Sequence, residues 1–231
     1  MSSSFRRKRA HSMTILLRNL SARTPKLSDA EAIATLLTIC DALEGGLSRY
    51  TEEEILTTWQ QPNFTLATDA LIIVTNQGEC VGYACLSHDQ HTCIRLQACV
   101  HPHYRGRGIG TLLLRLAEVR ARQRISFAPP EARVTLTNAV SGTNHAAKEL
   151  LEYEGYTFIN HFWRIVIETD EVSQMHKLVF DVNCSCVTGT IRTYEPSGLY
   201  TVCQYALYEK ELRTGNEMDT CETPNTQLMI A

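Results

Sequence analysis

A short segment rich in arginine and glycine is the first place in the sequence where residue types and spacing indicate chemistry. Residues 104–111 read YRGRGIGT, and a leucine-rich segment follows directly. The first turn of a helix has unpaired backbone N–H groups and about half a positive charge from the helix dipole. Glycines let an anion approach these groups closely, and Arg105 and Arg107 can add charge-assisted hydrogen bonds. The segment therefore predicts a cradle for a diphosphate at a helix N-terminus.

Other phosphate-binding loops fit this segment less well. A dinucleotide-binding GxGxxG loop that starts at Gly106 needs a further glycine where Thr111 stands. A Walker loop needs a lysine followed by serine or threonine, and no such lysine occurs here. A strand-to-helix turn without a ligand is the alternative, but it does not explain why three glycines lie beside two arginines.

The flanking sequence predicts the elements that position this loop. Residues 92–100 have the apolar and β-branched character of a strand, which ends at His101-Pro102. A helix is expected from Ile109, because apolar residues then recur at helical spacing. The expected apolar face of that helix consists of Leu112, Leu113, Leu116 and Val119.

The rest of the chain predicts an α/β (α+β) fold. Capping boxes at 28–31 and 51–54 predict two helices, which end at Gly45-Gly46 and before Pro62. The other elements are expected as a strand at 15–19, a hairpin of strands 71–75 and 80–86, a strand at 134–137, a helix at 144–154 and one or two strands at 156–167. This order indicates a mixed, mostly antiparallel sheet of about six to seven strands, flanked by about four helices.

Two motifs in this order resemble the GNAT superfamily of acetyl-CoA-dependent N-acyltransferases. Arg105-x-x-Gly108-x-Gly110, which follows Val100-His101-Pro102, is similar to motif A of that family. A second motif consists of Asn144-x-x-Ala147-x-x-Leu150 followed by Gly155-Tyr156. The resemblance covers roughly residues 15–169 and implies the GNAT fold.

The resemblance also implies how acetyl-CoA would lie. Its pyrophosphate would rest on residues 105–111, and its pantetheine arm would pair with residues 98–100 between splayed strands. A main-chain N–H near Val100 would polarise the thioester carbonyl. The expected cofactor-binding residues are therefore Ala98, Cys99, Val100, Arg105, Gly106, Arg107, Gly108, Ile109, Gly110, Thr111 and Asn144.

The catalytic acid and base are not identified by the sequence. Many family members have a tyrosine seven residues after the motif asparagine, where this chain has Leu151. Tyr153 lies about 200° around the helix from that position and is expected in the core or on the surface. His101 and His103 are candidates for the base, although an exposed or structural role is the expected one. Candidates for lining the acceptor pocket are Glu44, Tyr50, Trp59, Phe162 and Trp163.

Composition sets the broad class of the protein. The chain has 231 residues and a formal net charge of −3, and 44% of its residues are hydrophobic. These values are typical of a globular protein with a buried core. The nine cysteines lack the CxxC spacing of a zinc site and are expected to be free thiols in a reducing cytoplasm. No metal is expected.

Both ends of the chain are expected to differ from a GNAT domain at 13–170. Residues 1–12 contain the basic run RRKR and are expected to form a disordered tail, and no apolar run reaches the roughly 18 residues needed to span a membrane. Residues 171–231 would form a C-terminal extension, with a helix expected at 200–212. Because residues 190–194 are similar to residues 16–20, this extension is expected to be either a remnant of a second GNAT domain or an unrelated addition.

The expected function is the transfer of an acetyl group from acetyl-CoA to a primary amine by direct attack in a ternary complex. The acceptor would be a small amine, an amino sugar or a peptide N-terminus. A catalytically silent CoA-binding sensor or scaffold is the alternative. Neither nucleic acid nor a membrane is an expected partner, and binding of nucleic acid through residues 6–9 is the weakest hypothesis.

Overall fold

The computed structural model describes residues 19–45, 50–89, 91–171, 174–183 and 200–217. Its strands are β1 Leu20–Arg23, β2 Ala70–Thr75, β3 Cys80–Asp89, β4 Cys93–Val100, β5 Val134–Ser141, β6 Thr157–Glu171, β7 Gln174–Asn183 and β8 Tyr200–Arg213. Its α-helices are α2 Ala30–Leu43, α3 Glu52–Trp59, α4 Leu66–Asp69, α5 Ile109–Arg124 and α6 His145–Tyr153. The sequence predictions for residues 1–12, 15–18 and 190–194 lie outside the described residues.

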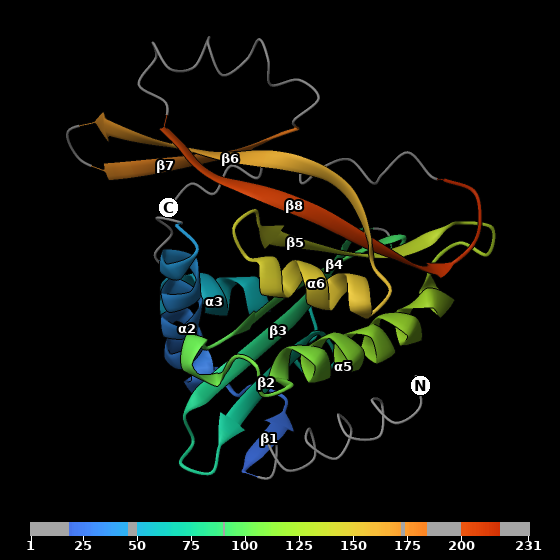
Figure 1. Cartoon of the computed structure of the whole chain (residues 1–231), viewed down its shortest axis with the longest axis horizontal. Helices are drawn as coiled ribbons and strands as arrows, with labels where there is room; N and C mark the ends of the chain where they lie inside the picture. The colour runs from blue at the N-terminus through green and yellow to red at the C-terminus, as the bar shows by residue number, and fades with distance from the viewer. Residues whose placement is uncertain (1–18, 46–49, 90, 172–173, 184–199, 218–231) are drawn as a thin grey trace, which may run out of the picture.

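The strands form one sheet in the order β1-β2-β3-β4-β5-β8-β6-β7 (Figure 1). Among these strands, β4 and β5 form the one parallel pair, and the other neighbours are antiparallel. This confirms the expected mixed, mostly antiparallel α/β fold, with eight strands in place of six to seven.

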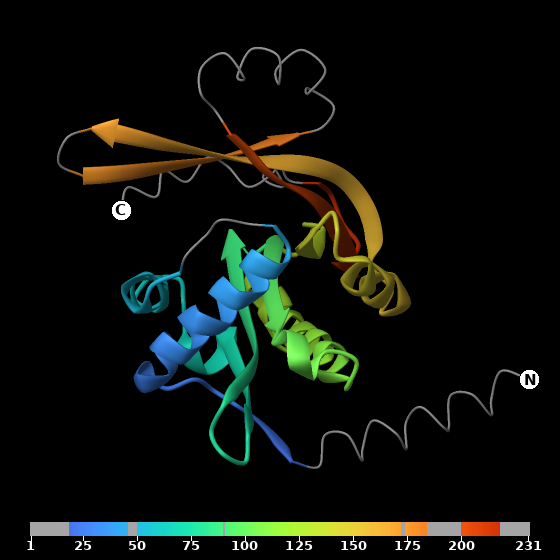
Figure 2. The same ribbon diagram turned by 60° about the vertical axis from the view of Figure 1, so that its left-hand side comes forward.

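Helices cover both faces of the sheet, and each face has its own core (Figure 2). On one face, α2 and α3 pack their buried residues against β2 and β3. On the other, α5 and α6 pack against β3, β4, β5 and β8. The loop that joins β4 to α5 therefore crosses from the sheet to the second of these layers.

The parallel strands β4 and β5 separate after four residue pairs. Their pairing runs from Cys93↔Thr135 to Leu96↔Asn138 and then ends. β4 continues to pair with β3 as far as Gly82↔Val100, and β5 continues to pair with β8 as far as Ser141↔Tyr205. Residues 97–100 and 139–141 are thus the two edges of a V-shaped opening in the sheet, which we call the splay.

The prediction of a helix at residues 200–212 is wrong, because this segment forms strand β8. β8 pairs with β5 on one side and β6 on the other. Its burial alternates, since Ala206, Tyr208 and Leu212 are buried while Glu209 and Glu211 carry ion pairs to Arg133. Strands β7 and β8, which the sequence assigns to a C-terminal extension, are therefore part of the same sheet.

Helix boundaries follow the predicted caps at one helix and not at another. Thr51 and Glu54 form the expected capping box of α3, with N···O distances of 3.2 and 2.8 Å. The box expected at Ser28 does not form. Instead, the carboxylate of Asp29 accepts a hydrogen bond from the Lys26 N–H at 2.6 Å and pairs with Arg23. The salt bridge to Arg23 occupies the acidic side chain that lies nearest the start of α2.

The apolar face of α5 is rotated from the predicted one. Its buried residues are Ile109, Leu113, Leu114, Ala117 and Ala121. Val119 is 54% exposed, so its assignment to the core face is wrong. Leu112 and Leu116 of the predicted face are partly buried against the same core.

Candidate functional site

The loop before α5 has the backbone geometry that its glycines predict. Gly106 and Gly108 have φ angles of +75° and +85°, in the left-handed region that favours glycine. Gly108 is the N-cap of α5, and its carbonyl accepts the first helical hydrogen bond from the Leu112 N–H at 3.0 Å. The N–H groups of residues 109–111, between Gly108 and Leu112, have no acceptor within the helix, as at any helix start.

The third glycine of the loop has a packing role. A Cβ atom on Gly110 would lie 2.9 Å from Cδ2 of Leu150 in α6. Gly82 in β3 acts similarly, because a Cβ there would lie 3.0 Å from Cγ2 of Ile109. Small residues at these positions bring the start of α5 close to both α6 and the sheet.

The two arginines of the loop point in different directions. Arg105 donates from Nε to the Val100 carbonyl at 3.3 Å and from a terminal nitrogen to Oε1 of Glu44 at 3.0 Å. Arg107 lies over the ring of Tyr104, 4.6 Å from its centroid, and donates to the His103 carbonyl at 3.2 Å. Arg105 therefore lies at the end of β4 beside the splay, whereas Arg107 stays on the loop.

Asn144 lies on the opposite side of the splay, at the start of α6. Its Oδ1 accepts a hydrogen bond from the Ala147 N–H at 3.0 Å, which makes Asn144 the N-cap of α6. Its Nδ2 donates to Oε1 of Glu44 at 2.6 Å. The Ser141 hydroxyl contacts the main-chain oxygen of Glu44 at 3.5 Å. The sequence proposed Asn144 as a ligand-binding residue but did not indicate its contact with the end of α2.

A pair of thiols lies beside Arg105. The Sγ of Cys40 in α2 is 3.5 Å from the Val100 carbonyl oxygen that also accepts from Arg105. A hydrogen bond from Cys99 and the positive charge of Arg105 lower the pKa of the Cys40 thiol, although burial acts in the opposite direction. The hydrogen bond to Cys40, together with burial, raises the pKa of Cys99 well above its usual range. Cys40, Cys80, Cys85, Cys93 and Cys99 are free thiols.

The positions considered for the catalytic acid and base lie on α6 and in the turn that follows β4. Leu151 is buried in the core beneath α6, whereas Tyr153 is 60% exposed, as expected for a surface residue. The Nδ1 atom of His101 accepts a hydrogen bond from the His103 N–H at 3.3 Å, so this ring caps its own turn.

Two candidates for lining the acceptor pocket lie in the core. Trp59 is buried and donates from Nε1 to the Tyr83 hydroxyl at 3.1 Å. Phe162 is fully buried and stacks on Tyr205, with ring centroids 5.3 Å apart. Glu44, another candidate for this role, contacts Arg105 on one side of the splay and Asn144 on the other.

The described residues contain no group of three or more His, Cys, Asp or Glu side chains that could hold a metal ion. None of the described helices is long and apolar enough to cross a membrane. What the site offers is hydrogen-bond donors, from the first turn of α5, from Arg105 and from Asn144.

Comparison with known proteins connects this geometry to a family. A sequence model of the acetyltransferase (GNAT) family matches residues 36–156, which include both sides of the splay. No curated protein shows significant sequence similarity to the chain.

Several solved structures share the fold. A GCN5-related N-acetyltransferase from Sphaerobacter thermophilus superposes with a TM-score of 0.74 at 19% identity, over 86% of this chain and 98% of that one. An N-acetyltransferase from Staphylococcus aureus Mu50 gives 0.56 at 18% identity, over 84% and 99%. yncA from Salmonella typhimurium, a candidate acetyltransferase solved with its cofactor acetyl-CoA, gives 0.56 at 15% identity, over 88% and 99%.

Proposed function

Because the chain belongs to the acetyltransferase (GNAT) family, we propose that it transfers the acetyl group of acetyl-CoA to a primary amine by direct attack in a ternary complex. One observation carries the proposal. A helix start with left-handed glycines lies at the open end of the splay between β4 and β5. The helix start suits a diphosphate, and the splay suits an extended chain that needs backbone partners.

The proposed binding mode uses each part of the site once. The diphosphate takes the N–H groups of Ile109, Gly110 and Thr111, where the helix dipole adds favourable potential. The pantetheine arm pairs with the edge of β4 at residues 98–100, which β5 leaves without a strand partner. Asn144 lies across the splay, so its amide is available to the same ligand after a change of partner.

The proposed reaction needs little from protein side chains. The neutral amine nitrogen attacks the thioester carbonyl and the C–S bond of the thioester breaks. The proton that the nitrogen gives up on forming the amide reaches the departing thiolate of CoA through water. A main-chain N–H near Val100 stabilises the developing oxyanion, and the two binding sites hold the reactants in contact. Loss of the amine proton to water is sufficient when the amine is partly neutral at the working pH. This agrees with Leu151 at the position where many relatives have a tyrosine.

Two measurements test the proposal in sequence. Titration calorimetry with CoA at low ionic strength should detect binding to the whole chain. Release of free thiol from acetyl-CoA should then exceed blank hydrolysis with at least one member of a panel of small amines, amino sugars and peptide N-termini. CoA binding without release for any acceptor would favour the silent sensor, and no binding would reject both functions.

We also propose that the protein works in the cytoplasm. The free thiols at Cys40, Cys80, Cys85, Cys93 and Cys99 support this location, because a reducing compartment keeps cysteines unpaired. Fractionation of the source cells, with mass spectrometry of alkylated peptides from each fraction, checks both the location of the protein and the oxidation state of these cysteines.

A further inference from the structure

Glu44 joins three segments that are distant in the sequence. It directly follows the last residue of α2, and its Oε1 accepts hydrogen bonds from Arg105 at 3.0 Å and from Asn144 at 2.6 Å. Arg105 belongs to the side of the splay that β4 and α5 form, and Asn144 belongs to the side that β5 and α6 form. The carboxylate of Glu44 therefore spans the open end of the splay.

The donors that hold Glu44 are those assigned to acetyl-CoA. Arg105 and Asn144 are expected to bind its diphosphate or pantetheine arm, and both now bind an anionic oxygen of the protein. A guanidinium group binds carboxylate and phosphate with the same geometry, so one group can replace the other. Two anions so close to each other would repel, and a bound diphosphate therefore works against the contact between Glu44 and Arg105.

The degree of exposure makes this exchange feasible. The side chain of Arg105 is 34% exposed and that of Glu44 is 22% exposed. An ion pair at such a surface is worth little, because water and salt screen both charges. A ligand that carries several negative charges can therefore take Arg105 from Glu44 without disrupting the core.

We propose that Glu44 is an internal anion that competes with the diphosphate of CoA for Arg105 and Asn144. In the absence of ligand, Glu44 holds the two donors together across the splay and neutralises Arg105. When CoA binds, its phosphate oxygens replace the carboxylate. Glu44 then no longer spans the open end of the splay, and the pantetheine arm can enter. This inference rests on the proposed function, because it takes CoA as the ligand.

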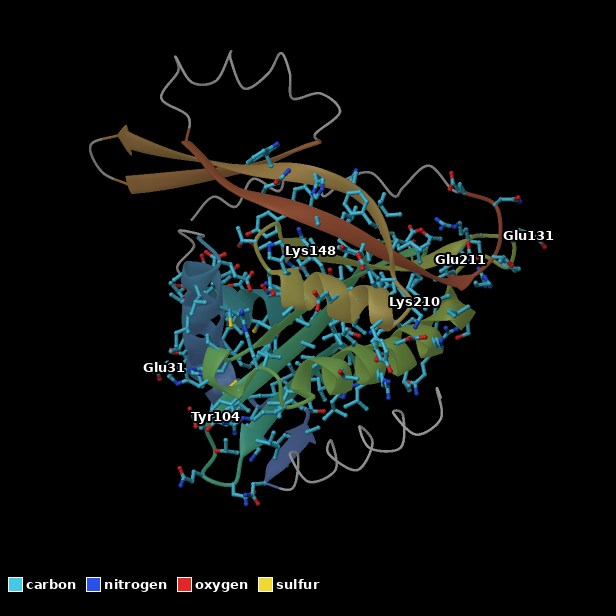
Figure 3. All side chains as sticks on the ribbon, viewed as in Figure 1. Glu31, Tyr104, Glu131, Lys148, Lys210 and Glu211 are labelled. Atoms are coloured by element: carbon cyan, nitrogen blue, oxygen red, sulfur yellow. The ribbon has the colours of Figure 1, made fainter. Side chains whose placement is uncertain are left out.

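The test compares CoA binding by the whole chain and its variants in titration calorimetry. Glu44→Gln keeps the size of the side chain but removes its charge, and Glu44→Ala removes the bridge altogether. Glu31→Gln is the matched control, because this substitution removes the same charge. Glu31 is exposed and lies near the other end of α2 (Figure 3). Thermal melting of each variant without ligand checks that it folds.

The expected result is a gain in affinity. Glu44→Gln and Glu44→Ala should each bind CoA about two- to fivefold more tightly than the wild type, as loss of a competing surface ion pair predicts. Glu31→Gln should bind as the wild type does. The gain should shrink when the salt concentration rises from about 0.05 M to about 0.5 M, because screening weakens exposed charges.

The outcomes separate this inference from the proposed function. If the wild type binds CoA and the Glu44 variants bind equally or more weakly, Glu44 organises the site and the competition is rejected. If Glu31→Gln gains as much as Glu44→Gln, a general charge effect explains the gain and the competition is again rejected. If the wild type gives no heat with CoA, the proposed function itself fails, and this inference fails with it.

Discussion

A negative charge at the N-cap of α5 should weaken CoA binding strongly without unfolding the protein. Gly108 has a φ of +85° and directly precedes Ile109, the first residue of the helix. Aspartate enters the left-handed region more readily than most residues, and a carboxylate at a helix N-terminus is stabilised by the helix dipole. Gly108→Asp should therefore leave the fold intact.

The size of the effect on binding follows from electrostatics. A diphosphate on the first-turn N–H groups would lie about 5 Å from the new carboxylate, where two unit charges repel by about 3 kcal/mol at an effective dielectric constant of about 20. Screening by salt reduces this value, so the affinity for CoA should fall by at least about thirtyfold at low ionic strength.

Gly78→Asp is the matched control for this variant. Gly78 lies in the turn between β2 and β3, has a φ of +86° and would place its Cβ in open space. Both variants add one negative charge and impose the same backbone strain. Calorimetry with CoA should show the loss only for Gly108→Asp, and melting without ligand should show that it is at least as stable as Gly78→Asp. If the two variants bind CoA within threefold of each other, the diphosphate does not lie at the start of α5.

Three further predictions concern Asp69, His88 and Tyr153. Asp69 is 1% exposed and pairs with Arg124, so Asp69→Asn should lower the free energy of unfolding by about 3–5 kcal/mol in urea titrations, because it leaves a mostly buried guanidinium without its counter-charge. A loss below about 1 kcal/mol would contradict this. Burial, and then the charge of Arg124, lowers the pKa of His88, so as the pH falls below about 6.5 the unfolded chain takes up the proton first and the free energy of unfolding should decrease. His88→Gln should lack this part of the pH dependence, and equal slopes in both proteins would refute the assignment. Tyr153→Phe should leave thiol release unchanged because the residue is 60% exposed, whereas a loss above about tenfold, worth about 1.4 kcal/mol of barrier, would identify Tyr153 as the acid.

Local chemistry made much of the fold predictable. The loop before α5 and the capping box at Thr51 are each determined by a few adjacent residues, and both form as the sequence indicates. The hairpin of β2 and β3 also forms where the change to strand-like composition predicts it. Such features depend on backbone geometry and caps, which neighbouring residues decide.

Long-range contacts account for what the sequence did not show. The apolar spacing of residues 200–212 fits both a helix and a strand, and pairing with β5 and β6 makes this segment strand β8. Glu44 contacts two residues that lie 61 and 100 positions later in the sequence, so no local pattern could indicate this bridge. The buried side of α5 depends on which residues approach β3 and β4 most closely. The sequence does not identify that side, because leucines lie on both sides of the helix.

The position of β8 between β5 and β6 determines the order in which this part of the sheet can assemble. A ribosome releases β5 and β6 well before β8, since β6 ends at Glu171 and β8 begins at Tyr200. Until then the two earlier strands have exposed edges that face each other, and direct pairing between them would exclude the last strand. β5 and β6 must therefore stay unpaired with each other until β8 has been synthesised. A chaperone that shields strand edges would be most useful during that interval.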